Sequence, residues 1–118
     1  MISLKGKDIL HGNQFSKKDI DGIIKIASHF EKELKKKDSL TLLKGKILAT
    51  LFFEPSTRTR LSFETAMQRL GGGVISMGSV ESSSVAKGET LTDTVRTVSQ
   101  YADVIVIRHP RTGSAKEA

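Results

Sequence analysis

Three short apolar runs alternate with segments in which apolar residues recur every three or four positions. The runs cover residues 47–53, 74–77 and 104–107, and the first is almost continuously apolar, as is typical of a strand buried on both faces. The intervening stripes, within 63–70 and 91–102, have the spacing of amphipathic helices. This order of strand, helix, strand, helix and strand predicts an α/β fold: a parallel sheet with flanking helices around a βαβαβ core.

A further helix is predicted near the start of the chain, from about residue 17 to 37. Ser16 and Asp19 have the spacing of a capping box, and an apolar stripe follows them. Lysines 35–37 fall in the last turn, where the helix dipole favours cations. We interpret this lysine run as a solvated helix end rather than as a nucleic-acid contact.

The composition narrows the possible classes of protein. The chain has 118 residues and no cysteine, which excludes disulfides and thiolate metal sites. It also has no apolar run long enough for a transmembrane helix. No secretory signal is visible, so we expect a cytoplasmic protein. The net charge is +6, but aromatic residues make up only 5% of the chain, which argues against a base-stacking nucleic-acid surface. All six arginines lie beyond residue 50, and arginine suits phosphate and carboxylate ligands.

The connections at one edge of the predicted sheet contain the candidate chemistry. In an open α/β sheet, ligands bind beyond the carboxyl ends of the strands. Segments 54–59, 78–88 and 108–113 must lie along that edge. The middle segment is long and polar compared with the usual connection of about 2–6 residues, which favours a binding loop.

The segment Glu54–Arg60 joins a predicted buried strand to the start of a helix, and helix starts bind anions through free N–H groups. Ser56, Thr57 and Thr59 add hydroxyl groups, and Arg58 adds a bidentate donor. A Walker A loop is absent, so the pattern favours a compact phosphate over a metal-bound triphosphate. The alternative is a simple Ser/Thr helix cap beside surface arginines.

Other polar residues of this edge have weaker signals. Arg108 ends the third predicted strand and could point at the same anion or lie on the surface. His109 precedes a proline, and we interpret it as structural rather than as an acid or base. Ser84 and Lys87 lie on the long loop, where Lys87 could reach a phosphate. No cluster of residues has metal-ligand spacing, so no metal or other cofactor is expected.

The segment from Phe52 to Glu64, FFEPSTRTRLSFE, resembles the carbamoyl phosphate signature of the aspartate and ornithine carbamoyltransferase family. Two further segments, SVAKGET at 84–90 and VIRHP at 106–110, look like the catalytic chain of the aspartate branch. Ornithine enzymes usually lack both, so the ornithine branch is the runner-up. The resemblance covers essentially the whole chain and is strongest from 46 to 113.

The resemblance implies roles for the residues of the first and third connections. Ser56, Thr57, Arg58 and Thr59 would hold the phosphate of carbamoyl phosphate, and Thr59 and Arg108 would approach its carbonyl oxygen. Arg58, Thr59 and Arg108 would therefore be the catalytic residues of the chain.

Roles between subunits and domains are implied as well. Ser84 and Lys87 would enter the active site of a neighbouring subunit, because catalytic chains of the family form trimers, in some members with regulatory chains. Glu54 would bridge to arginines of a second domain when the enzyme closes.

The implied reaction transfers the carbamoyl group of carbamoyl phosphate to the amino group of L-aspartate, early in pyrimidine biosynthesis. Family chains are more than twice as long, so residues 1–118 are interpreted as an incomplete carbamoyl phosphate-binding domain without the aspartate-binding domain. We expect these 118 residues alone to be inactive. A noncatalytic phosphate-binding or assembly module, or a basic nucleic-acid binder, are the alternatives from other classes.

Overall fold

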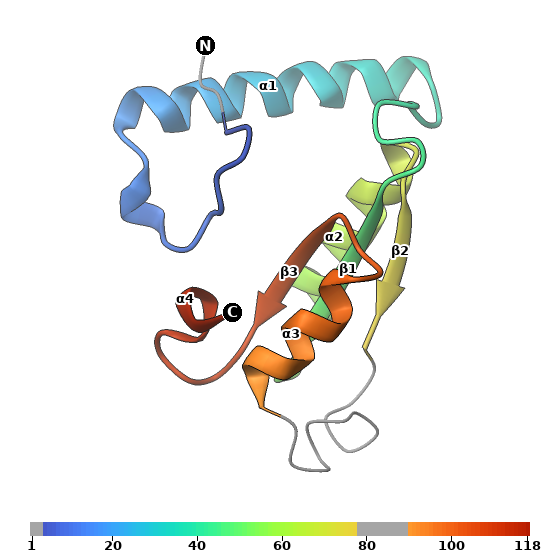
Figure 1. Ribbon diagram of the computed structural model, residues 1–118. Helices are drawn as coiled ribbons and strands as arrows, with labels where there is room; N and C mark the ends of the chain where they lie inside the picture. The colour runs from blue at the N-terminus through green and yellow to red at the C-terminus, as the bar shows by residue number, and fades with distance from the viewer. Residues whose placement is uncertain (1–3, 78–89) are drawn as a thin grey trace. The chain divides into compact units, whose positions relative to one another are not determined.

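The computed structural model describes residues 4–77 and 90–118 (Figure 1). The chain divides into two compact units, residues 1–38 and 39–118. The predicted binding loop at 78–88, together with Ser84 and Lys87, lies outside the described residues. Within the described ranges, no helix is long and apolar enough to cross a bilayer.

The first unit contains a short 3-10 helix, η1 (Gly12–Gln14), and the long helix α1 (Lys17–Lys36), which confirms the predicted helix. The Ser16 hydroxyl accepts a hydrogen bond from the Asp19 N–H at 3.1 Å, and the Asp19 carboxylate accepts one from the Ser16 N–H at 3.0 Å. This reciprocal pair is the capping box that the sequence predicted. Lys35 and Lys36 occupy the last turn, as expected from the helix dipole.

Acid should loosen the start of α1. The hydrogen bond from the Ser16 backbone N–H, followed by that of the Ser16 side chain, lowers the pKa of Asp19 in the folded chain. A lowered folded pKa stabilises the cap above the unfolded pKa, and this contribution is lost as pH falls through the folded value. We expect the Ser16 amide NMR shift to titrate with Asp19 in the acid range. Asp19→Asn should remove that titration; an unchanged curve would contradict the capping role.

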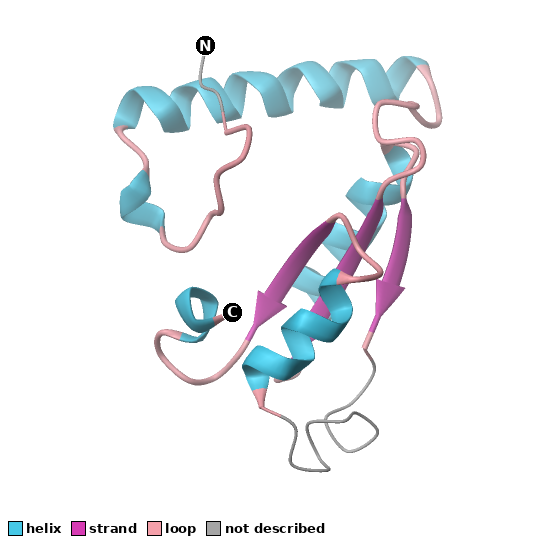
Figure 2. Cartoon of the chain, viewed as in Figure 1, coloured by secondary structure: helices cyan, strands magenta, loops and turns pink. Residues whose placement is uncertain are grey.

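The second unit is built on the sheet drawn in Figure 2, whose strands are β1 (Ile47–Phe52), β2 (Gly73–Ser76) and β3 (Val104–Arg108). The order is β2-β1-β3, and β1 pairs in parallel with both neighbours. The parallel sheet predicted from the apolar runs is confirmed. As predicted, β1 is buried, and its side chains form most of the core of the described residues.

Helices follow each strand. They are α2 (Thr57–Arg69), α3 (Leu91–Ser99) and the short α4 (Ser114–Glu117). In Figure 1, α2 lies behind the sheet and α3 in front of it. Helix α2 contacts both β1 and β2. It ends before Gly71, whose φ of 94° and close approach to the Leu40 carbonyl leave no room for a Cβ. The glycines therefore end this helix, as the sequence indicated.

The strand order creates a switch point beside β1. The chain leaves β1 towards β2 on one side, whereas β3 returns on the other side of β1. In open α/β sheets the crevice for ligands forms at the carboxyl ends of two strands whose connections diverge in this way. The carboxyl ends of β1 and β3 are thus the expected place for a ligand.

Candidate functional site

Arg108 is the centre of a polar cluster at this switch point. The register of β1 and β3 pairs Arg108 with Phe52, the last residue of β1. The Phe53 N–H continues the pairing by donating to the Arg108 carbonyl at 2.8 Å. The two strands therefore hold the guanidinium next to the segment that follows β1.

The Arg108 guanidinium joins three side chains from that segment. Its Nε donates to Glu54 Oε1 at 2.8 Å, its Nη1 donates to Ser56 Oγ at 2.8 Å, and Nη1 is 3.4 Å from Thr59 Oγ1. No described residue accepts a hydrogen bond from Nη2, so this end of the fork can bind a ligand oxygen. The Arg108 side chain keeps 45% of its surface exposed, which leaves it accessible.

The N-terminus of α2 has no side-chain cap. Ser56 occupies the N-cap position, but its hydroxyl bonds Arg108 instead of a backbone N–H of the first turn. The first turn contains no acidic residue, and Thr57 and Arg58 are exposed there. Arg58 has no hydrogen bond or ion pair with any described residue. Free N–H groups, the positive end of the dipole and an exposed guanidinium are together the features of helix starts that bind anions.

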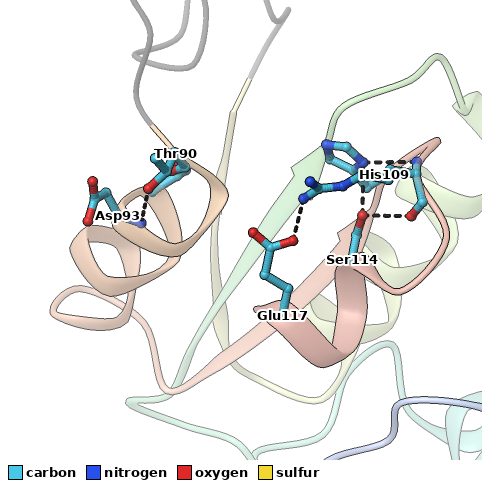
Figure 3. Close-up of polar contacts among 7 residues, drawn as sticks. Thr90, Asp93, His109, Ser114 and Glu117 are labelled. Carbon is cyan, nitrogen blue, oxygen red and sulfur yellow. Dashed lines mark hydrogen bonds and ion pairs between the residues drawn. The ribbon is translucent and has the colours of Figure 1, made fainter.

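Two other helices of the chain show what a capped start looks like. In α3 the Thr90 hydroxyl accepts from the Asp93 N–H at 3.1 Å, and Asp93 lies in the first turn (Figure 3). Ser16 and Asp19 do the same for α1. The contrast argues against the simple helix-cap alternative for Ser56, because the Ser56 hydroxyl accepts from none of the first N–H groups of α2.

His109 has the contacts of a structural residue. Its Nδ1 accepts from the Arg111 N–H at 3.0 Å and lies 3.0 Å from Ser114 Oγ (Figure 3). Its ring centroid lies 5.1 Å from that of Phe53. Arg111 is ion-paired with Glu117. These bonds fold the turn after β3 back on itself, in agreement with the structural interpretation of His109. Arg111 is thus engaged within the turn, whereas Arg108, at the end of β3, contacts the segment after β1.

One residue near the site was not singled out by the sequence. Glu64 on α2 has a side chain only 17% exposed, and its Oε2 accepts from the Thr50 hydroxyl at 2.9 Å. In the sequence it ends the segment 52–64 and stands three residues before Met67, on the same helix face, but neither position indicates its contact with Thr50. In residues 4–77 and 90–118, no group of three or more His, Asp or Glu residues could hold a metal ion.

Comparisons with known proteins agree with this geometry. Residues 7–118 match the family described as aspartate/ornithine carbamoyltransferase, carbamoyl-P binding domain. The aspartate carbamoyltransferase catalytic subunit of Thermococcus kodakarensis is 60% identical over 97% of the chain, and that of Methanosarcina barkeri is 55% identical over 99%. The chain spans 37% and 38% of the lengths of these two relatives.

A solved structure shares the fold. Aspartate transcarbamoylase from Trypanosoma cruzi, in complex with carbamoyl aspartate and phosphate, is 50% identical and has a TM-score of 0.90. The match covers 98% of this chain and 37% of that one. The same enzyme is also known in complex with carbamoyl phosphate and aspartate. From its sequence signature, its sheet and these matches, the chain belongs to the aspartate/ornithine carbamoyltransferase family and corresponds to the carbamoyl-P binding domain.

Proposed function

We propose that the chain binds carbamoyl phosphate for transfer of its carbamoyl group to the amino group of L-aspartate, giving N-carbamoyl-L-aspartate and phosphate. The observation that carries this proposal is that two groups of hydrogen-bond donors, the start of α2 and the Arg108 guanidinium, lie at the same edge of the sheet. The uncapped start of α2 offers N–H groups and Arg58 to a phosphate, and Arg108 offers Nη2 beside it. The relatives, named as aspartate carbamoyltransferases, support the choice of acceptor.

The proposed mechanism follows from where charge develops. The amine attacks the carbonyl carbon, and negative charge accumulates on the carbonyl oxygen. Arg108 and Thr59 stabilise this oxyanion more strongly than the neutral carbonyl of the ground state, which accelerates the reaction. The carbon–oxygen bond to phosphate then breaks, the attacking nitrogen passes one proton to the departing phosphate oxygen, and the resulting hydrogen phosphate dianion remains matched by Ser56, Thr57, Arg58 and the helix N-terminus.

The roles that depend on further chain belong to the same proposal. Ser84 and Lys87 would complete the site of a neighbouring subunit in a homotrimer. The predicted location of the protein is the cytoplasm. Glu54 would exchange partners on closure; here it pairs with Arg108, which keeps its carboxylate at the edge of the site. Aspartate would bind chiefly to a second domain, as expected from the share of the relatives that the chain spans.

Calorimetry and a product assay on the native gene product test the proposal. We expect saturable carbamoyl phosphate binding and carbamoylation of L-aspartate, but not of L-ornithine. Carbamoylation of L-ornithine instead would assign the runner-up branch. Binding of carbamoyl phosphate without transfer to either amine would indicate a noncatalytic module, and the absence of binding would refute the site itself. As a separate arm, residues 1–118 alone should show no turnover.

A further inference from the structure

A chain of hydroxyl groups beneath α2 links two strands to that helix. Thr50, at the middle of β1, is fully buried, and its Oγ1 lies 2.9 Å from Glu64 Oε2 and 3.0 Å from Ser76 Oγ on β2. An ionised carboxylate can only accept, so the Thr50 hydroxyl donates to Glu64. The single hydroxyl proton is then used, and Ser76 donates to Thr50. The hydrogen bonds therefore run from β2 through β1 to α2.

An apolar contact between β1 and α2 could replace these hydrogen bonds. Valine has nearly the shape of threonine, and leucine at 64 would extend the apolar face of Met67. Replacing a satisfied buried polar pair by apolar groups of similar shape is often nearly neutral for stability. A directional bond has a different effect, because it fixes one geometry of helix on sheet where apolar surfaces tolerate several.

The bond lies close to the proposed phosphate site along the helix. Glu64 follows Thr59 by five residues, about 7.5 Å of helix rise. Its Oε2 also lies 4.0 Å from Nε of Arg60, in the first turn of α2. Because a helix moves as a rigid body over this distance, the position of Glu64 sets the position of the first turn relative to Arg108 on β3.

We propose that Glu64 is a positioning residue for carbamoyl phosphate, acting through Thr50 to set how the start of α2 faces Arg108. This inference rests on the proposed function. Groups of the first turn of α2 move together, so an ion held by that turn alone is insensitive to small shifts of the helix. Carbamoyl phosphate must reach both α2 and β3, so a shift of one element against the other weakens its binding; in active sites a misplacement of about 1 Å can cost about 100-fold in rate.

The test compares two ligands in the native gene product by calorimetry. In the double variant Thr50→Val, Glu64→Leu, we expect the Kd of carbamoyl phosphate to rise about 10-fold or more, whereas the Kd of inorganic phosphate changes less than about 2-fold. Glu64→Gln keeps an acceptor for Thr50 and should restore carbamoyl phosphate affinity to near the unaltered value. Circular dichroism establishes folding, and Thr50→Val alone replaces the double variant if that one does not fold.

Thr94→Val is the matched control. Thr94 is also buried, and its hydroxyl donates to the Thr90 carbonyl within α3, away from α2. Its substitution should leave both affinities unchanged. If the unaltered protein binds both ligands and the double variant keeps both affinities or loses both alike, the positioning role is overturned while the proposed function stands. If the unaltered protein does not bind carbamoyl phosphate, the proposed function fails and the positioning role falls with it.

Discussion

Arg58→Ala is expected to raise the Kd of carbamoyl phosphate roughly 100-fold in the native gene product. Arg58 is exposed in the first turn of α2, and no described residue competes for its guanidinium. The substitution removes the proposed charge-assisted, bidentate contact to the phosphate, which would contribute about 3 kcal/mol, or roughly a 100-fold change in Kd. Isothermal titration calorimetry with carbamoyl phosphate measures the loss directly.

Two variants separate geometry from net charge at this position. Arg58→Lys keeps the charge but loses the planar fork, so we expect an intermediate Kd. Arg96→Ala removes the same charge from the last turn of α3 and should leave the Kd unchanged. If Arg58→Ala bound carbamoyl phosphate as tightly as the unaltered protein, the phosphate site would have to lie elsewhere.

Arg108→Ala is expected to lower kcat about 100- to 1,000-fold, more than it raises the KM for carbamoyl phosphate. The oxyanion exists only during the reaction, and removing one donor to such a charge costs about 3–4 kcal/mol of transition-state stabilisation. The substitution also leaves the Glu54 carboxylate and the hydroxyls of Ser56 and Thr59 without their shared donor. Steady-state kinetics with carbamoyl phosphate and L-aspartate give both parameters.

Arg111→Ala is the matched control for Arg108. Arg111 lies three residues further along, in the turn after β3, and its guanidinium is engaged by Glu117. We expect its kcat to stay within about 2-fold of the unaltered protein, because it stabilises the turn rather than the reacting atoms. Equal losses of kcat in both variants would mean that the turn, and not the Arg108 guanidinium, supports the reaction.

The elements buried on the sheet could be predicted most completely from the sequence. Residues 47–53 have no alternation, which is the pattern of a central strand, and β1 ends one residue earlier than predicted. The start of α2 was less visible. Its apolar stripe begins at Phe63, but the helix begins at Thr57, because its first turn is polar and is not part of the core. Helix α3 ends at Ser99 rather than near Ala102, although the N–H groups of Tyr101 and Ala102 still donate to the Val98 carbonyl in the turn that follows.

The candidate site could be predicted as a set of residues but not as a network. The order of strands implied that Arg108 and the segment after β1 share an edge, and the structure brings Arg108 to Glu54, Ser56 and Thr59. The hydroxyl groups that bind the Arg108 guanidinium are determined by side-chain geometry, which the spacing of apolar and polar residues does not predict. The roles of Ser84 and Lys87 stay predictions.

Glu64 shows the limit of pattern reasoning most clearly. In a helix of mixed character, a glutamate beside an arginine four residues earlier is typical of a solvated face. Thr50, in turn, looks like one more β-branched residue of a buried strand. Only the packing of α2 on the sheet brings the two together, because the hydroxyl buried within β1 needs a partner and the helix supplies one.

Because no side chain caps the start of α2, a ligand bound there would increase the stability of the domain. A phosphate group seated there does for this helix what Ser16 and Thr90 do for α1 and α3: it satisfies the first N–H groups and balances the dipole. Any oxyanion that prefers the folded chain raises its stability by RT ln(1 + [L]/Kd). Under the proposed function, the substrate would be a structural component of the domain that binds it, and the start of α2 would be less stable without it.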